Sequence, residues 1–163
     1  MQVTHISTIV KPGFTDFTNA FEKLAGRITK SDVTNIVTDP EGTRRHIETL
    51  QGYQDLIIFD IQDHGSLFNL IGEKRFAKQY LIGNPLIAFS MTRHDIRAAL
   101  YAPLRVLVYT DGQNRTTIEY DKPSDLFGQF GIPQITEVGL GLDQKVEKLV
   151  EKAVEDSVSV KQQ

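Results

Sequence analysis

The chain has 163 residues, of which 40% are hydrophobic and 24% charged, and its formal net charge is −3. These are ordinary values for a globular domain, and a slightly acidic surface repels phosphate backbones, so nucleic-acid binding is not expected. Because the chain has no cysteine, disulfides, thiolate chemistry and cysteine-based zinc sites are excluded, and the composition suits a reducing cytoplasm, where we expect the protein to be.

The length fits one domain. We expect a single α+β domain over residues 1–156 and a frayed C-terminal tail over residues 157–163. Residues 1–12 lack the basic start and apolar core of a signal peptide, and no apolar run approaches the roughly 20 residues of a membrane span. Neither secretion nor membrane contact is therefore expected.

The N-terminal third predicts a strand followed by helices. Residues 3–10 alternate and are rich in β-branched side chains, which is typical of a strand. An apolar stripe at spacings of three or four then predicts a helix with a core-facing side, formed by Phe14, Phe17, Phe21, Leu24 and Ile28. Residues 29–55 carry the weakest signals, although Asp39 and Pro40 indicate the start of a helix.

The middle of the chain predicts two strands that are each followed by helical segments. Residues 56–62 form the clearest strand, with odd-numbered side chains on one face, and residues 67–71 form a short helix after a turn. Residues 80–82 predict a short strand. Asn84 as the cap and Pro85 as the first helical residue then predict a helix over residues 84–91. Residues 96–101 add a further helical turn.

The C-terminal part predicts a hairpin and a closing helix. Residues 105–110 and 115–120 are β-rich, and the turn-forming residues 111–114 lie between them. Residues 123–127 predict a short helix, and residues 142–153 an amphipathic closing helix. Strands and long crossover helices do not alternate, so we expect an α+β fold in which one mixed or antiparallel sheet is covered by helices.

Motifs of cofactor-dependent enzymes are absent from the sequence. There is no G-x-G-x-x-G after a strand, no P-loop, no H-E-x-x-H and no G-x-S-x-G. No cofactor is therefore expected.

A first candidate site lies in the polar stretch after residue 91. His94 could act as a general base, with the carboxylate of Asp95 orienting it, although adjacent helical residues point to different sides and need not touch. Arg93 and Arg97 are four residues apart and would share a helical face, where two guanidinium groups could bind a carboxylate or phosphate. The competing interpretation is a polar helix end with its charges in water.

A second candidate lies at the end of the strand over residues 56–62. Asp60, Asp63 and His64 place two carboxylates and an imidazole within five residues, and oxygen and nitrogen ligands of this kind could hold a metal. The spacing is not diagnostic of a metal site. Asp63 is equally suited to cap the next helix, and His64 to lie in the turn. These residues are weak metal candidates, and no bound metal is expected.

A third candidate is Arg105, at the start of the first hairpin strand. Its side chain would share a sheet face with Tyr109, and Tyr101 lies just upstream, so the arginine could hold an anion or stack on a ring. The alternative role is a salt bridge, to Asp125 or to the closing helix. The sequence leaves these two interpretations open.

At these residues the chain resembles a known family. The similarity lies in Tyr80-Leu81-Ile82-Gly83-Asn84-Pro85-Leu86-Ile87-Ala88, in 91–95, in 100–109 and in 120–127. These blocks resemble the bacterial proteins of domain-of-unknown-function family 302, over roughly residues 50–130. The resemblance implies a small α+β fold similar to the TATA-binding-protein-like topology and a homodimer. It implies no DNA binding and assigns no catalytic residue.

Three functions follow as hypotheses. The first is a protein that binds a small anionic organic molecule through Arg93, Arg97 and Arg105, with Tyr101 and Tyr109 as apolar walls. The second is a cofactor-independent isomerase, lyase or hydrolase in which His94 is the base. The third is a dimeric structural or interaction module. The expected partners are a small-molecule ligand and a second copy of the chain, and neither a nucleic acid nor a membrane.

Overall fold

A six-stranded sheet forms the centre of the fold in the computed structural model, which describes residues 1–160. The strand order is β1-β6-β5-β4-β3-β2, and every neighbouring pair is antiparallel except β2 and β3, which are parallel. The predicted mixed sheet of an α+β fold is therefore confirmed. The strands are His5–Val10 (β1), Gly26–Arg27 (β2), Ile57–Asp63 (β3), Ala77–Gly83 (β4), Leu104–Thr110 (β5) and Thr116–Asp121 (β6).

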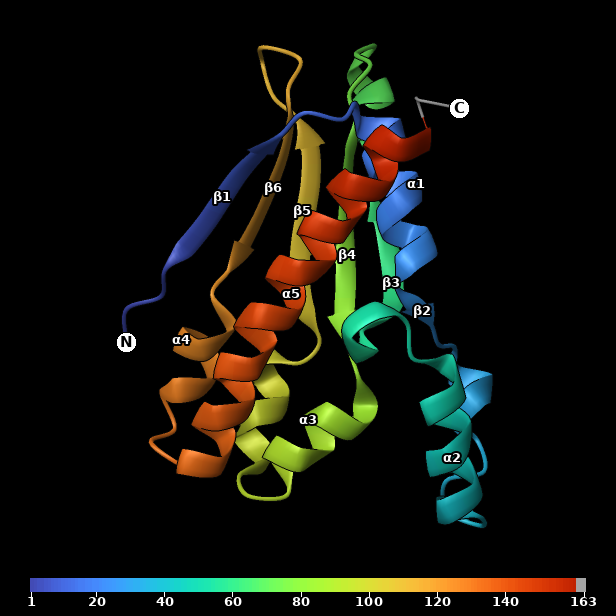
Figure 1. The fold of residues 1–163 in the computed structure, drawn as a ribbon, viewed down its shortest axis with the longest axis vertical. Helices are drawn as coiled ribbons and strands as arrows, with labels where there is room; N and C mark the ends of the chain where they lie inside the picture. The colour runs from blue at the N-terminus through green and yellow to red at the C-terminus, as the bar shows by residue number, and fades with distance from the viewer. Residues whose placement is uncertain (161–163) are drawn as a thin grey trace.

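Helices cover one face of this sheet and extend beyond its lower end. The α-helices are Phe14–Leu24 (α1), Pro40–Leu50 (α2), Pro85–Thr92 (α3), Pro123–Gly128 (α4) and Pro133–Val160 (α5). The short 3-10 helices are Lys30–Val33 (η1), Tyr53–Asp55 (η2), Ser66–Ile71 (η3) and Ile96–Tyr101 (η4). Helices α1 and α5 pack against each other across the sheet, whereas α3 and α4 lie at its lower end (Figure 1). None of the helices in the described residues has the length and apolarity needed to cross a bilayer.

The main core lies between the sheet and the helices α1 and α5. Even-numbered side chains of the three middle strands point toward these helices and are fully buried, namely Tyr80, Ile82, Val106, Val108 and Ile118. Phe17 and Phe21 of α1 meet them, and α5 contributes the predicted apolar stripe Leu142, Val146, Leu149 and Ala153. The interpretation of the α1 phenylalanines as core is therefore confirmed.

The odd-numbered side chains of the middle strands point to the opposite face of the sheet, which α1 and α5 do not cover. Arg105, Leu107 and Tyr109 of β5 lie there, and all three are exposed or partly exposed. The prediction that Arg105 and Tyr109 share a face follows from the strand period and agrees with this burial pattern. We call this surface the open face, and the candidate site lies on it.

One predicted element boundary is wrong at the N-terminal side. Helix α1 ends at Leu24, and Ile28 lies beyond it in a separate small core with Ile47 and Ile57. The chain leaves the helix because Gly26 joins the sheet beside β3. A Cβ atom at Gly26 would lie 1.8 Å from the carbonyl oxygen of Leu50, so only glycine allows this approach.

A β-bulge changes the predicted faces of β3. Ile58 pairs with Ile82, but the next paired residue is Asp60, opposite Leu81, which leaves Phe59 as the extra residue. The bulge turns Asp60 to the open face. Strict alternation over residues 56–62 therefore predicted the wrong sheet faces for the side chains after Ile58.

Two elements are longer than their sequence signals. Strand β4 has seven residues instead of three, and α5 begins at Pro133 and continues to Val160. The prediction of a frayed tail from residue 157 is therefore wrong up to residue 160. Ser157 is 4% exposed, and its hydroxyl donates hydrogen bonds to the carbonyl oxygens of Ala153 and Asp16. The rest of that predicted tail, residues 161–163, lies outside the described residues.

Candidate functional site

A hollow of about 420 Å³ lies where strand β5 begins, at the edge of the open face. It is lined by Leu81, Leu100, Tyr101, Ala102, Pro103, Leu104, Arg105, Asp121 and Leu126. Strand β5 positions Arg105, and the preceding helix η4 positions Tyr101. The volume lies within the range of small-molecule sites, and the lining combines an apolar wall with few charged groups.

The guanidinium of Arg105 is free in this hollow. It forms no hydrogen bond or ion pair with any side chain that the structure describes, so the proposed salt bridge to Asp125 or to α5 is not formed. Asp125 instead accepts a hydrogen bond from the backbone N–H of Thr4, at 2.8 Å. An arginine that has no protein partner and faces a hollow can offer all its donors to a ligand.

Tyr101 forms part of the wall beside Arg105. Its ring packs edge-on against Phe130, with the ring centroids 6.2 Å apart, and its hydroxyl donates to Oε1 of Gln129 at 3.4 Å. These contacts hold the ring in place. The predicted pair of Tyr101 and Arg105 is thus brought together by the fold.

A polar cluster around Glu119 continues from the hollow along the open face. The imidazole of His5 lies between two carboxylates, with Nε2 2.9 Å from Oε2 of Glu119 and Nδ1 3.1 Å from Oδ1 of Asp121. The hydroxyls of Tyr109 and Ser7 both donate to Oε1 of Glu119, at 2.6 and 3.3 Å. Asp121, which also lines the hollow of Arg105, is therefore already engaged by His5.

The contacts of this cluster shift its titrations. Hydrogen bonds from Tyr109 and then from His5 hold the pKa of Glu119 below its ordinary value. Glu119 and then Asp121 raise the pKa of His5 above 6.5, because only the imidazolium can donate from both nitrogens. The carboxylate of Glu119 also raises the pKa of Tyr109. The cluster is therefore most favourable with His5 protonated and Glu119 ionised.

We expect the pKa of His5 to lie above 6.5 and to fall toward 6.5 in the variant Glu119→Gln. A raised pKa means that the stability contributed by His5 is fully present below pH 6.5 and is lost as pH rises through the folded-state pKa. The lowered pKa of Glu119 adds stability above pH 4.5 that is lost as pH falls through its folded-state pKa. Titration of the His5 ring protons by NMR measures the shift.

His46 provides an internal control in the same spectra. Its Nε2 lies 2.8 Å from Oδ1 of Asp32, far from β1, so its ring signals at a fixed pH should be the same in the Glu119 variant and in wild type. An unchanged midpoint for His5 in that variant would show that Glu119 does not hold the imidazolium.

The residues predicted around His94 do not join the hollow of Arg105. Helix α3 ends at Thr92 and η4 begins at Ile96. Arg93 and Arg97 therefore do not share one continuous helical face, and the prediction that they would is wrong. Arg93, His94 and Arg97 are all exposed, and none of them lines the hollow.

Asp95 is occupied by Arg97 and does not orient His94. Its carboxylate accepts the backbone N–H of Arg97 at 3.0 Å and lies 2.6 Å from the Nη2 atom of the same residue. These hydrogen bonds also lower the pKa of Asp95. The guanidinium of Arg97 lies over the ring of Phe130 at 5.7 Å. Residues 93–95 therefore form a largely solvent-exposed polar turn between α3 and η4, which is closer to the competing interpretation of a polar helix end than to a binding site.

The weak metal candidates are separated by the fold. Asp63 accepts the backbone N–H of Ser66, the first residue of η3, at 2.9 Å, while Asp60 accepts from the side-chain amide of Gln62 at 3.4 Å. His64 lines a different hollow near Tyr109. Within the described part of the chain, no three histidine or carboxylate side chains are placed to share a metal ion.

Sequence reasoning missed His5, Glu119 and Asp121. A signal was present, because the odd-numbered residues of β1 and β6 include polar side chains that alternate with apolar ones. What the sequence did not reveal is the pairing of β1 with β6, in which His5 lies opposite Asp121 and Ser7 opposite Glu119. This pairing joins residues more than 110 positions apart.

Comparison with known proteins gives a family match and matches to solved structures. The family described as domain of unknown function DUF302 matches residues 33–156, so the match extends at both ends beyond the range of roughly 50–130 over which the sequence resembles the family. The chain is similar to the crystal structure of an uncharacterized conserved DUF302 protein from Bacillus stearothermophilus, with a TM-score of 0.64 and 14% identity over 91% of this chain and 97% of that one. This likeness shows the fold. No curated protein matches the chain.

Proposed function

The chain belongs to the DUF302 family. From the geometry of the hollow around Arg105 we propose that it binds a small organic anion there. The observation that carries the proposal is the free guanidinium of Arg105 in a hollow whose other charged group, Asp121, is held by His5. The planar guanidinium of an arginine recognises carboxylates and phosphates through paired hydrogen bonds.

The lining indicates the rest of the ligand. Leu81, Leu100 and Leu126 lie around Arg105 together with the ring of Tyr101. Such a wall favours an apolar body, and the single free cation favours one carboxylate at its end. Small aromatic or branched acids have this chemistry. The sequence hypothesis of three ligand-binding arginines is thereby reduced to Arg105, because Arg93 and Arg97 do not line the hollow.

The cofactor-independent enzyme has less support. A general base must come within hydrogen-bonding reach of the substrate, and His94 does not line the hollow. His5 is near, but both of its nitrogens are engaged by carboxylates. A binding role needs no such base.

The interaction module is the second candidate function. It is supported by large apolar side chains that are more than half exposed on α3 and η4, namely Phe89, Ile96 and Leu100. A second copy of the chain could cover them and form the homodimer expected from the family resemblance. A stable dimer in sedimentation equilibrium, together with no binding of any small acid, would favour this candidate.

The ligand proposal predicts that Arg105→Gln weakens the binding of small acids at least about tenfold, because hydrogen bonds to charged groups contribute about 1.5–3 kcal/mol. The probes are benzoate and phenylacetate, each compared with its neutral amide, and calorimetric titration gives the affinities. We expect wild-type protein to prefer the acids.

The matched control is Arg93→Gln, which removes another exposed arginine that does not line the hollow. It should bind the acids as wild type does, and both variants should retain the wild-type melting temperature. Equal binding of acids and amides, or unchanged affinity in Arg105→Gln, would refute the proposal.

A further inference from the structure

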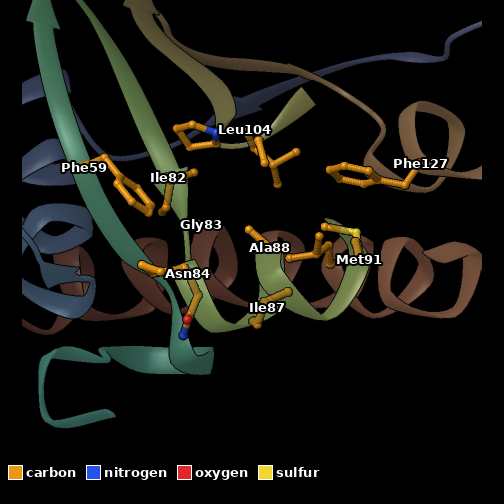
Figure 2. A pocket seen from close by; sticks show the side chains of 13 residues that line it. Phe59, Ile82, Gly83, Asn84, Ile87, Ala88, Met91, Leu104 and Phe127 are labelled. Atoms are coloured by element: carbon orange, nitrogen blue, oxygen red, sulfur yellow. The ribbon is translucent and has the colours of Figure 1, made fainter. Parts of the chain in front are cut away.

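A second, apolar cavity lies below the lower end of the sheet (Figure 2). Its volume is about 140 Å³, and it is bounded by β3, β4, α3, the start of β5, α4 and α5. Figure 2 shows Phe59 and Ile82 on one side and Phe127 and Met91 on the other, with Ala88 between them below. The lining residues are Phe59, Ile82, Gly83, Asn84, Pro85, Ile87, Ala88, Met91, Ala102, Pro103, Leu104, Phe127 and Leu142.

The cavity offers a ligand no polar partner among side chains. None of the described residues that line it is charged, and its single side-chain amide, that of Asn84, is already engaged. The Nδ2 of Asn84 donates to the carbonyl oxygen of Asp55, and its Oδ1 accepts from the backbone N–H of Leu86, both at 2.8 Å. In Figure 2 this amide points away from the middle of the cavity. Water, which needs two to four polar partners, is poorly held in such a space.

The volume of the cavity suits a small apolar ligand. An apolar cavity of about 150 Å³ in another protein stays dry and takes up benzene. The cavity here has nearly this volume and a lining of the same chemistry. Phe59, Ile87 and Ala88 are partly exposed, so the cavity is reached from the surface.

The space persists because small residues stand at its wall. A Cβ atom added to Gly83 would meet Cε2 of Phe59 at 3.7 Å and Cβ of Pro103 at 3.8 Å, which are ordinary contact distances. Alanine would therefore fit at this position without strain and would fill part of the cavity. Ala88 and Ala102 are the other small side chains of the wall.

We propose that this cavity is a binding site for a small uncharged apolar molecule, or an apolar group, of about the size of benzene or toluene. The site is separate from the hollow of Arg105. The two share wall residues Ala102, Pro103 and Leu104, but Arg105 does not line the apolar cavity. Binding here needs no charge on the ligand, so its test is independent of the anion proposal.

The experiment is a titration with benzene, followed by NMR of the side-chain methyl groups. In wild type we expect saturable shifts at the methyls of Ile82, Ala88 and Met91. The variant Gly83→Ala should bind benzene at least about threefold more weakly, because its added methyl occupies part of the site. Ala88→Leu, which fills more of the cavity, should show no saturable shifts.

The control is Gly13→Ala, which adds the same methyl at a position where it meets nothing within 4 Å, and it should bind benzene as wild type does. Gly83→Ala and Ala88→Leu both fill the cavity, and one of them is enough for the test if the other does not fold. The proposal is overturned if benzene leaves the cavity methyls unshifted, or if a folded filling variant binds as tightly as wild type. It is also overturned if the shifts occur only at the methyls of exposed residues such as Ile71 and Ile96.

Discussion

Replacing Phe21 by alanine is expected to lower the free energy of unfolding by about 3–5 kcal/mol. The ring of Phe21 is fully buried between α1 and the sheet, with its centroid 4.9 Å from that of Tyr80 and 5.8 Å from that of Phe17. Its removal takes away both the apolar transfer energy and the packing of two aromatic neighbours. Urea unfolding followed by circular dichroism measures the change.

The matched control is Phe89→Ala, which removes the same side chain from a position that is 61% exposed. This variant should stay within about 0.5 kcal/mol of wild type. The assignment of the main core would be contradicted if the two variants lost similar stability, or if Phe21→Ala lost less than about 1 kcal/mol.

Replacing Asn84 by alanine is expected to cost about 2–3 kcal/mol. Asn84 is 2% exposed and has two structural roles, since it caps the N-terminus of α3 and holds the carbonyl group of Asp55. Loss of the cap costs about 1 kcal/mol, and loss of the second hydrogen bond inside the protein adds a similar or larger amount. The same unfolding measurement applies.

Asn84→Ser separates the two roles of this residue. Serine can cap a helix, but it is too short to replace the amide that donates to Asp55, so about 1 kcal/mol should be regained relative to alanine. If the free energy of unfolding of Asn84→Ala lies within about 0.5 kcal/mol of the wild-type value, the junction between β4 and α3 does not depend on this side chain.

Several elements could be predicted because their signals are local. The Asn84-Pro85 pair begins α3 as expected, and Asp39 accepts the backbone N–H of Gly42 at 2.9 Å and so caps α2. The hairpin of β5 and β6 also follows from two β-rich runs and a polar loop. Each of these signals lies within a few residues of the structure that it specifies.

Elements that depend on distant neighbours could not be predicted. The two-residue strand β2 exists because β3 lies beside it, and the bulge at Phe59 appears only in the pairing of β3 with β4. Strand β4 is long because it lies in the middle of the sheet, whereas its first residues, Ala77, Lys78 and Gln79, have little β-propensity.

The residues of the candidate site also divide into those with a local sequence signal and those that depend on a distant strand pairing. Tyr101 and Arg105 were predicted together because they lie close in the sequence, and both line the hollow. Tyr109 shares the sheet face of Arg105 through the strand period, but it does not line this hollow and binds Glu119 instead. His5 and Glu119 were missed because β1 reaches β6 from the other end of the chain. His94 was overestimated because residue type alone suggested a base, whereas the fold places it in an exposed turn.

The central claim is that the free guanidinium of Arg105 holds an organic anion in the hollow. The most direct test is an NMR titration that follows the Nε–Hε signal of Arg105 while benzoate or benzamide is added. We predict a saturable shift of this signal with benzoate and none with benzamide, and no saturable shift of the corresponding signal of Arg93. An Arg105 signal that benzoate leaves unchanged, or that moves no differently from the signal of Arg93, would contradict the claim.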